Sequence, residues 1–277
     1  MITARMALAG YQGGFVLGSD GNRIAYLIHE GEQTKPAIVF VHGLGADAMG
    51  FKPQLEHFRD QGYTVLSYDL RGHGKSDAST WPGFYNFDAL ARDLRAIVKT
   101  LLTDREIVLV GHCIGGAIVM IYEEFYPGES KRLFLLSSTA NHKRSPLGTI
   151  LRLYMRLTPS RYFHKDDRLS RNRRKYTHAS RDFTFRKQLR AISATNPINY
   201  GGLLLQFCDF DMRDELSAFT SPTTIVVGEF DSVFPVEHSV FLNEGIPGSE
   251  LIILQGKNHP LPLNAAQEVC AIIEERI

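Results

Sequence analysis

Short apolar runs bounded by turn-forming residues recur along the chain. Runs of this length, rich in β-branched and aromatic residues, are typical of buried β-strands. The pattern therefore predicts seven strands, at residues 23–28, 37–41, 64–68, 107–110, 133–137, 224–227 and 251–254.

Helical spacing of apolar residues fills most of the intervals between these strands. The predicted helices cover residues 51–59, 88–102, 114–125, 236–243 and 265–275. From the third strand onward, strand and helix alternate, which is typical of an α/β fold: a mostly parallel sheet with helices on both faces. The alternation stops at residues 141–216, where helical patterns dominate. We predict that residues 1–140 and 217–277 form the α/β core and that residues 141–216 form an inserted helical cap.

One helix of this cap has a recognisable start. Ser145 can cap it, and Pro146 suits its first position. Its apolar residues then fall on one face, which either packs in the core or lines a channel for an acyl chain. These residues are Leu147, Ile150, Leu151 and Tyr154.

Composition limits the classes of protein that remain. A chain of 277 residues with 44% hydrophobic content suits one α/β domain with an insertion. The N-terminus lacks a signal-peptide pattern, and no apolar run reaches the roughly 18 residues that a membrane span requires, so a cytoplasmic location is expected. The three cysteines form no CxxC pair and have no His or Cys at metal-ligand spacing. We expect no metal, no cofactor and no nucleic-acid partner.

Charge is distributed unevenly along the chain. Residues 141–190 contain 15 Lys and Arg against 3 acidic residues, a net charge of +12, whereas the rest of the chain carries −11. The predicted cap is therefore basic and the predicted body acidic. The basic segment fits phosphates of an acyl-CoA, an acyl carrier protein or an anionic membrane surface, or else it is a solvated face balanced by the acidic body. Its densest cluster consists of Arg171, Arg173, Arg174 and Lys175.

The strongest chemical signal is a cysteine where a predicted strand turns into a helix. Residues 108–117 read VLVGHCIGGA, an apolar run that breaks into G-x-C-x-G. This pattern is typical of a nucleophile elbow, with Cys113 in the position of the nucleophile. Gly111 and Gly115 provide the space that so sharp a turn requires. The helix N-terminus next to the sulfur favours its thiolate form.

Together with three further landmarks, the elbow resembles the α/β-hydrolase superfamily, in the branch with a helical cap. The other landmarks are VHGLG at 41–45, YDLRGHGKSD at 68–77, and VGEFDSVFP at 227–235 followed by GKNH at 256–259. The family order of nucleophile, acid and histidine implies a catalytic triad of Cys113, Asp231 and His259. Glu229 is the rival candidate for the acid. Most members have serine as nucleophile, and the cysteine box is similar to those of dienelactone hydrolases and polyhydroxyalkanoate synthases.

The same resemblance implies an oxyanion hole. Its donors would be the backbone N–H groups of Ile114, in the elbow, and Leu44, in the His-Gly-Leu-Gly loop. A competing interpretation of this loop is a dinucleotide site, because residues 43–48 fit G-x-G-x-x-A and Asp69 follows at the end of the next strand.

Three function classes follow from these residues. The first is a hydrolase that cleaves a small ester, lactone or acyl thioester through an acyl-cysteine. The second is an acyltransferase that uses the same intermediate, because a thioester carbonyl remains open to attack by amines and thiols. The third is a hydrolase-fold protein that binds a ligand with little turnover.

Overall fold

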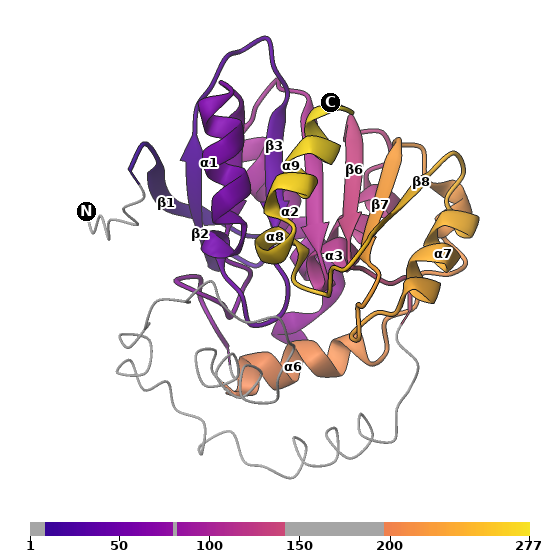
Figure 1. Ribbon diagram of the computed structural model, residues 1–277. Helices are drawn as coiled ribbons and strands as arrows, with labels where there is room; N and C mark the ends of the chain where they lie inside the picture. The colour runs from indigo at the N-terminus through magenta and orange to yellow at the C-terminus, as the bar shows by residue number, and fades with distance from the viewer. Residues whose placement is uncertain (1–8, 80–81, 142–196) are drawn as a thin grey trace.

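The computed structural model describes residues 9–79, 82–141 and 197–277 and shows one eight-stranded sheet (Figure 1). The strand order is β1-β2-β4-β3-β5-β6-β7-β8, in which β1 and β2 are antiparallel to their neighbours and the others pair in parallel. The strands are β1 (Gln12–Leu17), β2 (Arg23–His29), β3 (Ala37–Val41), β4 (Thr64–Tyr68), β5 (Ile107–His112), β6 (Arg132–Leu136), β7 (Thr223–Gly228) and β8 (Glu250–Leu254). All seven predicted strands are present, and β1 is an additional one.

Helices cover both faces of the sheet, as the alternation predicts. On one face, α1 (Lys52–Asp60), α8 (Leu261–Asn264) and α9 (Ala266–Glu274) pack against Ile38 and Phe40 of β3. On the other face, α2 (Phe87–Leu101), α3 (Ile114–Phe125) and α7 (Val236–Gly245) pack in the core that contains Val39 and Val41. Because side chains alternate along a strand, the fully buried run of β3 supplies both cores.

Three single-turn 3-10 helices occur among the described residues. They are η1 (Ala48–Phe51), η2 (Pro82–Tyr85) and η5 (Leu216–Ala218). η2 and η5 lie in connections, and η1 leads into the helix predicted over residues 51–59, with which it shares Phe51. None of the described helices is long and apolar enough to cross a membrane.

The predicted cap is described only near its two junctions with the core. Asn141 forms an antiparallel bridge with Asp211, and α6 (Pro197–Phe207) lies before the second junction. The ring of Phe207 lies 6.1 Å from that of Phe87 and 5.7 Å from that of Phe234, so the end of α6 belongs to the core. The candidate cap residues Leu147, Ile150, Leu151, Tyr154, Arg171, Arg173, Arg174 and Lys175, and the helix start at Ser145, lie outside the described residues.

Candidate active site

Cys113 lies at the sharp turn between β5 and α3 (Figure 1). Its backbone has φ +56° and ψ −121°, a conformation that non-glycine residues rarely adopt and that is concentrated at functional sites. A Cβ on Gly111 would lie 2.5 Å from the carbonyl oxygen of Gly115, and one on Gly115 would collide with the carbonyl of Val41. Both glycines of the elbow pattern are therefore required by contact with backbone.

The loops after β7 and β8 bring Asp231 and His259 together. The Nδ1 nitrogen of His259 lies 2.9 Å from Oδ2 and 3.0 Å from Oδ1 of Asp231, and both side chains are buried. Asp231 Oδ1 also accepts the N–H groups of Val233 and Phe234, each at 2.9 Å. The carboxylate is thus fixed by its own loop while it orients the imidazole.

The electrostatics of His259 couple it to both other candidates for the triad. Burial lowers the pKa of His259, but the charge of Cys113 and hydrogen bonds with Asp231 and Cys113 outweigh it and raise the pKa to about 10. Burial raises the pKa of Asp231, and the hydrogen bond and charge of His259 more than offset this, so that its pKa is lowered. Cys113, His259 and Asp231 form one chain of interacting groups, with His259 in the middle.

The His-Gly-Leu-Gly loop lies beside the elbow. Val41 pairs with Gly111 at the ends of β3 and β5, and a Cβ on Gly43 would lie 3.0 Å from that of Cys113. Leu44 packs in the same core cluster as Cys113. The loop and the first residue of α3, Ile114, therefore both lie beside Cys113.

Two further histidines form hydrogen bonds with the backbone of the loops around Cys113. His42 donates from Nδ1 to the carbonyl of Gly43 at 2.8 Å and accepts the Leu70 N–H on Nε2 at 3.0 Å. His112 Nε2 lies 3.0 Å from the carbonyl oxygen of His259. Burial and the charge of His259 lower the pKa of His112 to about 3, so its ring is neutral and donates to that carbonyl.

Glu229 and Asp69, the residues on which the alternative interpretations depend, have other partners. Glu229 Oε2 accepts the N–H of Gly256 at 2.8 Å. Asp69 is buried, and its two oxygens accept the N–H groups of Ala48 at 2.8 Å and Lys75 at 2.7 Å. Because both Asp69 oxygens bind its own chain, the residue does not present an acid to a ribose.

Sequence reasoning missed an aromatic wall next to the histidine. The ring of Phe234 lies edge-on to His259, with centroids 5.5 Å apart. Phe207 lies next to Phe234, and Phe210 stacks on Phe207 at 5.8 Å. Sequence patterns did not indicate this wall, because they do not show which residues far apart in the sequence come into contact.

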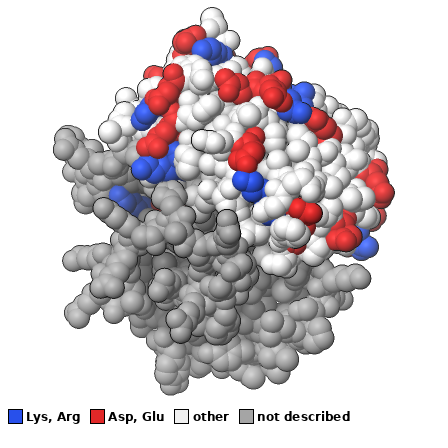
Figure 2. Space-filling view, in the orientation of Figure 1, with Lys and Arg blue, Asp and Glu red and all other residues white. Residues whose placement is uncertain are grey.

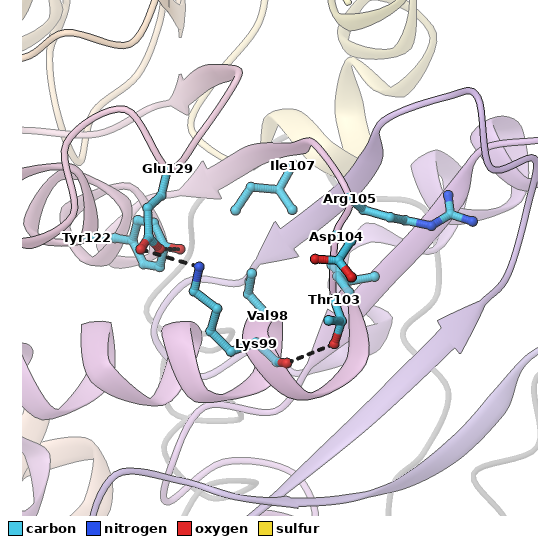
Figure 3. Close-up of a pocket in the computed structure, with 9 residues that line it drawn as sticks. Val98, Lys99, Thr103, Asp104, Arg105, Ile107, Tyr122 and Glu129 are labelled. Atoms are coloured by element: carbon cyan, nitrogen blue, oxygen red, sulfur yellow. Dashed lines mark hydrogen bonds and ion pairs between the residues drawn. The ribbon is translucent and has the colours of Figure 1, made fainter.

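A separate pocket of about 230 Å³ opens at the far end of β5 (Figure 3). Val98, Ile107 and Tyr122 line it, and Lys99 pairs there with Glu129 at 3.3 Å. Ile107 begins the strand that Cys113 follows, so this pocket lies away from the elbow. On the face shown in Figure 2, acidic and basic side chains of the described residues are interspersed.

Fold and site together define the class of α/β-hydrolase proteins. A family described as alpha/beta hydrolase fold matches residues 36–266, and the chain belongs to it. It is 27% identical over 257 residues to the AB hydrolase superfamily protein YisY of Bacillus subtilis, covering 86% of this chain and 90% of that protein. It is 28% identical over 273 residues to the bifunctional esterase/perhydrolase DCH of Acinetobacter calcoaceticus, covering 92% and 96%. A crystal structure of a Pseudomonas aeruginosa PA01 hydrolase superimposes with a TM-score of 0.77 at 21% identity, over 97% of this chain and 98% of that one, and shows the shared fold.

Proposed function

We propose that this protein is a cysteine-dependent hydrolase of small carboxylic esters, lactones or acyl thioesters. The observation that carries the proposal is the buried pair of His259 and Asp231, which interacts with Cys113. Cys113 itself has a strained backbone conformation and directly precedes α3. Backbone strain, an oriented base and a nucleophile in one constellation favour catalysis over passive ligand binding.

Acylation follows from the positions of these groups. The Cys113 thiolate attacks the substrate carbonyl carbon, a C–S bond forms, and the carbonyl electron pair moves to oxygen. The N–H groups of Leu44 and Ile114 stabilise this oxyanion. When the intermediate collapses, the bond to the leaving group breaks and protonated His259 gives its proton to the departing alkoxide or thiolate. Asp231 stabilises the imidazolium until that transfer.

In deacylation His259 acts as a base toward water, and Cys113 becomes the leaving group. His259, now neutral, takes a proton from water as the water attacks the acyl-cysteine carbonyl. The second oxyanion forms in the same hole, and its collapse breaks the C–S bond and releases the acid. The Cys113 sulfur leaves as the thiolate and again pairs with the protonated histidine.

The substrate class is supported by two observations. The relative DCH is named as an esterase/perhydrolase, and this chain covers 96% of its length. The ring of Phe234 contacts His259 and packs against that of Phe207, so the surroundings of His259 are apolar. The acyl group of an ester or lactone suits these apolar surroundings.

Acyl transfer is a second candidate because the nucleophile is cysteine. An acyl-cysteine is a thioester, which amines and thiols attack more readily than they attack a serine ester. Adding a small amine or thiol to the reaction and measuring the ratio of transfer product to free acid separates the two functions. A ratio that stays constant as the acceptor concentration rises favours hydrolysis.

Activated esters such as p-nitrophenyl acetate test the proposal. We expect Cys113→Ala to abolish turnover and Cys113→Ser to keep part of it with a shift toward hydrolysis, because the family uses serine in the same geometry. Cys270→Ala is the matched control, since Cys270 is buried in α9 away from the elbow. Labelling of Cys208 or Cys270 by iodoacetamide with loss of activity, while Cys113→Ala remains active, contradicts the proposal.

A further inference from the structure

The loop that carries Leu44 is a β-turn whose middle peptide is not locked by sterics. The Ala46 N–H donates to the Gly43 carbonyl at 3.2 Å, and Gly45 has φ +75°, the value required at the third position of a type II turn. Glycine adopts positive and negative φ with similar ease, so the Leu44–Gly45 peptide can flip unless a partner holds it.

His73 is that partner. Its Nε2 accepts the Gly45 N–H at 3.2 Å, and its Nδ1 lies 3.2 Å from the carbonyl oxygen of Arg71. Burial and the charge of His42 lower the pKa of His73 to about 3. The ring is therefore neutral, with the proton on Nδ1 donated to Arg71 and with Nε2 free of a proton to accept from Gly45.

His73 belongs to a set of contacts between this loop and residues 69–75. The ring of His73 packs edge-on against that of His42 at 5.2 Å, and His42 accepts the Leu70 N–H. Asp69 accepts the Ala48 N–H just beyond the turn. The turn is thus supported at its start, its middle and its end, and His73 supplies the contact to the middle peptide.

We propose that His73 is a positioning residue for the oxyanion: by holding the Gly45 N–H it fixes the backbone of the turn directly after Leu44, while His42 holds the Gly43–Leu44 peptide through the Gly43 carbonyl, and the two contacts together keep the Leu44 N–H aimed at the developing oxyanion. This inference rests on the proposed function, in which Leu44 is an oxyanion donor. His73 contacts neither substrate nor Cys113 in this scheme. Its loss should weaken binding of the transition state and leave binding of the substrate nearly unchanged.

Two neutral, polar substitutions separate the hydrogen bond from simple packing. In His73→Gln the side-chain oxygen reaches the place of Nε2 and can accept the Gly45 N–H. In His73→Asn the amide reaches only the place of Nδ1, so it can donate to Arg71 but cannot accept from Gly45. We expect His73→Asn to lower kcat about 10-fold to 100-fold, as misaiming an oxyanion donor does, with little change in KM. His73→Gln should stay within about 3-fold of wild type.

Two reagents that attack the same sulfur sharpen this test. An alkyl trifluoromethyl ketone forms a tetrahedral adduct whose oxyanion needs the hole, so its Ki should rise in His73→Asn in parallel with the loss of kcat. Iodoacetamide alkylates Cys113 by displacement at carbon and forms no oxyanion, so its rate constant should not change. Equal losses in the Gln and Asn variants, or an unchanged Ki in His73→Asn, overturn the proposal.

A measurement on the wild-type protein covers the case in which His73→Asn does not fold. The ring nitrogens in a long-range ¹H–¹⁵N spectrum should show His73 protonated on Nδ1, and protonation on Nε2 contradicts the inferred acceptor. Failure of the proposed function is recognised separately. If Cys113→Ala hydrolyses the ester at the wild-type rate, the hydrolase mechanism and the role of His73 in it are both wrong. If Cys113→Ala is inactive but His73→Asn has wild-type kinetics, only the positioning role of His73 is refuted.

Discussion

The carboxylate of Asp231 lies within 3.0 Å of His259 Nδ1 through both of its oxygens, at 2.9 and 3.0 Å. This contact fixes the tautomer in which Nε2 faces away from Asp231, so Nε2 is the nitrogen available to exchange a proton with Cys113. The amide of Asp231→Asn can donate to Nδ1 and thereby select the wrong tautomer.

We therefore expect Asp231→Asn to lower kcat by on the order of 10³-fold to 10⁴-fold. Glu229→Gln is the matched control, because Glu229 follows the same strand but accepts the Gly256 N–H. Steady-state kinetics with an activated ester measures both variants. A larger loss in Glu229→Gln than in Asp231→Asn would mean that the acid is misassigned.

The raised pKa of His259 makes stability depend on pH. The value of about 10 in the folded protein lies above the ordinary 6.5, so the protonated histidine stabilises the folded state. This contribution is fully present below about pH 6.5 and is lost as the pH rises through about 10. We expect the difference in free energy of unfolding between wild type and His259→Gln to shrink over this interval.

Denaturant titrations at several pH values measure that difference. Cys113→Ala should weaken the pH dependence as well, because the charge of Cys113 is the largest of the causes that raise the pKa of His259. A difference that stays constant from pH 7 to pH 10 would contradict the raised pKa and show that His259 is already neutral in the folded protein.

Arg71 forms a buried ion pair that holds the loop containing His73. Its guanidinium is fully buried and contacts Asp93 of α2, with Nε to Oδ2 at 2.7 Å and Nη2 to Oδ1 at 2.8 Å. Removing Asp93 leaves the buried guanidinium with only the half-exposed Asp20, 2.7 Å from its Nη1, as an ionic partner, and breaking a buried pair costs about 3–5 kcal/mol. We expect Asp93→Asn to lower the free energy of unfolding by about this amount.

Asp88→Asn on the same helix is the control, since Asp88 pairs with Arg92 at 3.9 Å and both are exposed. Such a surface pair contributes about 0–1 kcal/mol. Equilibrium unfolding in urea compares the two variants. Equal effects would show that the Arg71 pair is not a main support of this region.

Much of this architecture is predictable from sequence because it depends on local patterns. The buried runs of β3 and β5 and the glycines around Cys113 fix the strands and the elbow before any contact is known. The edge strand β1 was missed because its sequence, QGGFVL, contains two glycines and leaves Phe15 and Leu17 exposed. An amphipathic alternation cannot be recognised where neither face is consistently buried.

Contacts between distant loops are the part that the sequence could not predict. Asp93 is 22 residues from its partner Arg71 in the sequence, and Gly45 is 28 residues from His73, which accepts its N–H. Asp231 and His259 could be assigned as acid and base only from the order of catalytic residues in the family that the chain resembles. The hydrogen bond from the Gly45 N–H to His73 follows from the register of β3 with β4, which places the two loops side by side.

The basic segment provides a prediction about substrate choice. If residues 141–190 bind phosphates, reversing Arg171, Arg173, Arg174 and Lys175 to glutamate should raise KM for an acyl-CoA and leave a small neutral ester nearly unaffected. Salt should have the same effect, because exposed charges are screened beyond about 8 Å at physiological ionic strength. A KM for acyl-CoA that is constant across salt concentrations and charge reversals would assign these charges to a solvated face.

The covalent intermediate is the central claim, and intact-protein mass spectrometry tests it most directly. Incubation with a panel of activated esters, lactones and acyl-CoAs, followed by rapid acid quenching, should trap the protein with the mass of one acyl group added. Peptide mapping should place this group on Cys113, and Cys113→Ala should carry none. An acyl group on another residue, or turnover by Cys113→Ala at the wild-type rate, would contradict the assignment of Cys113 as the nucleophile.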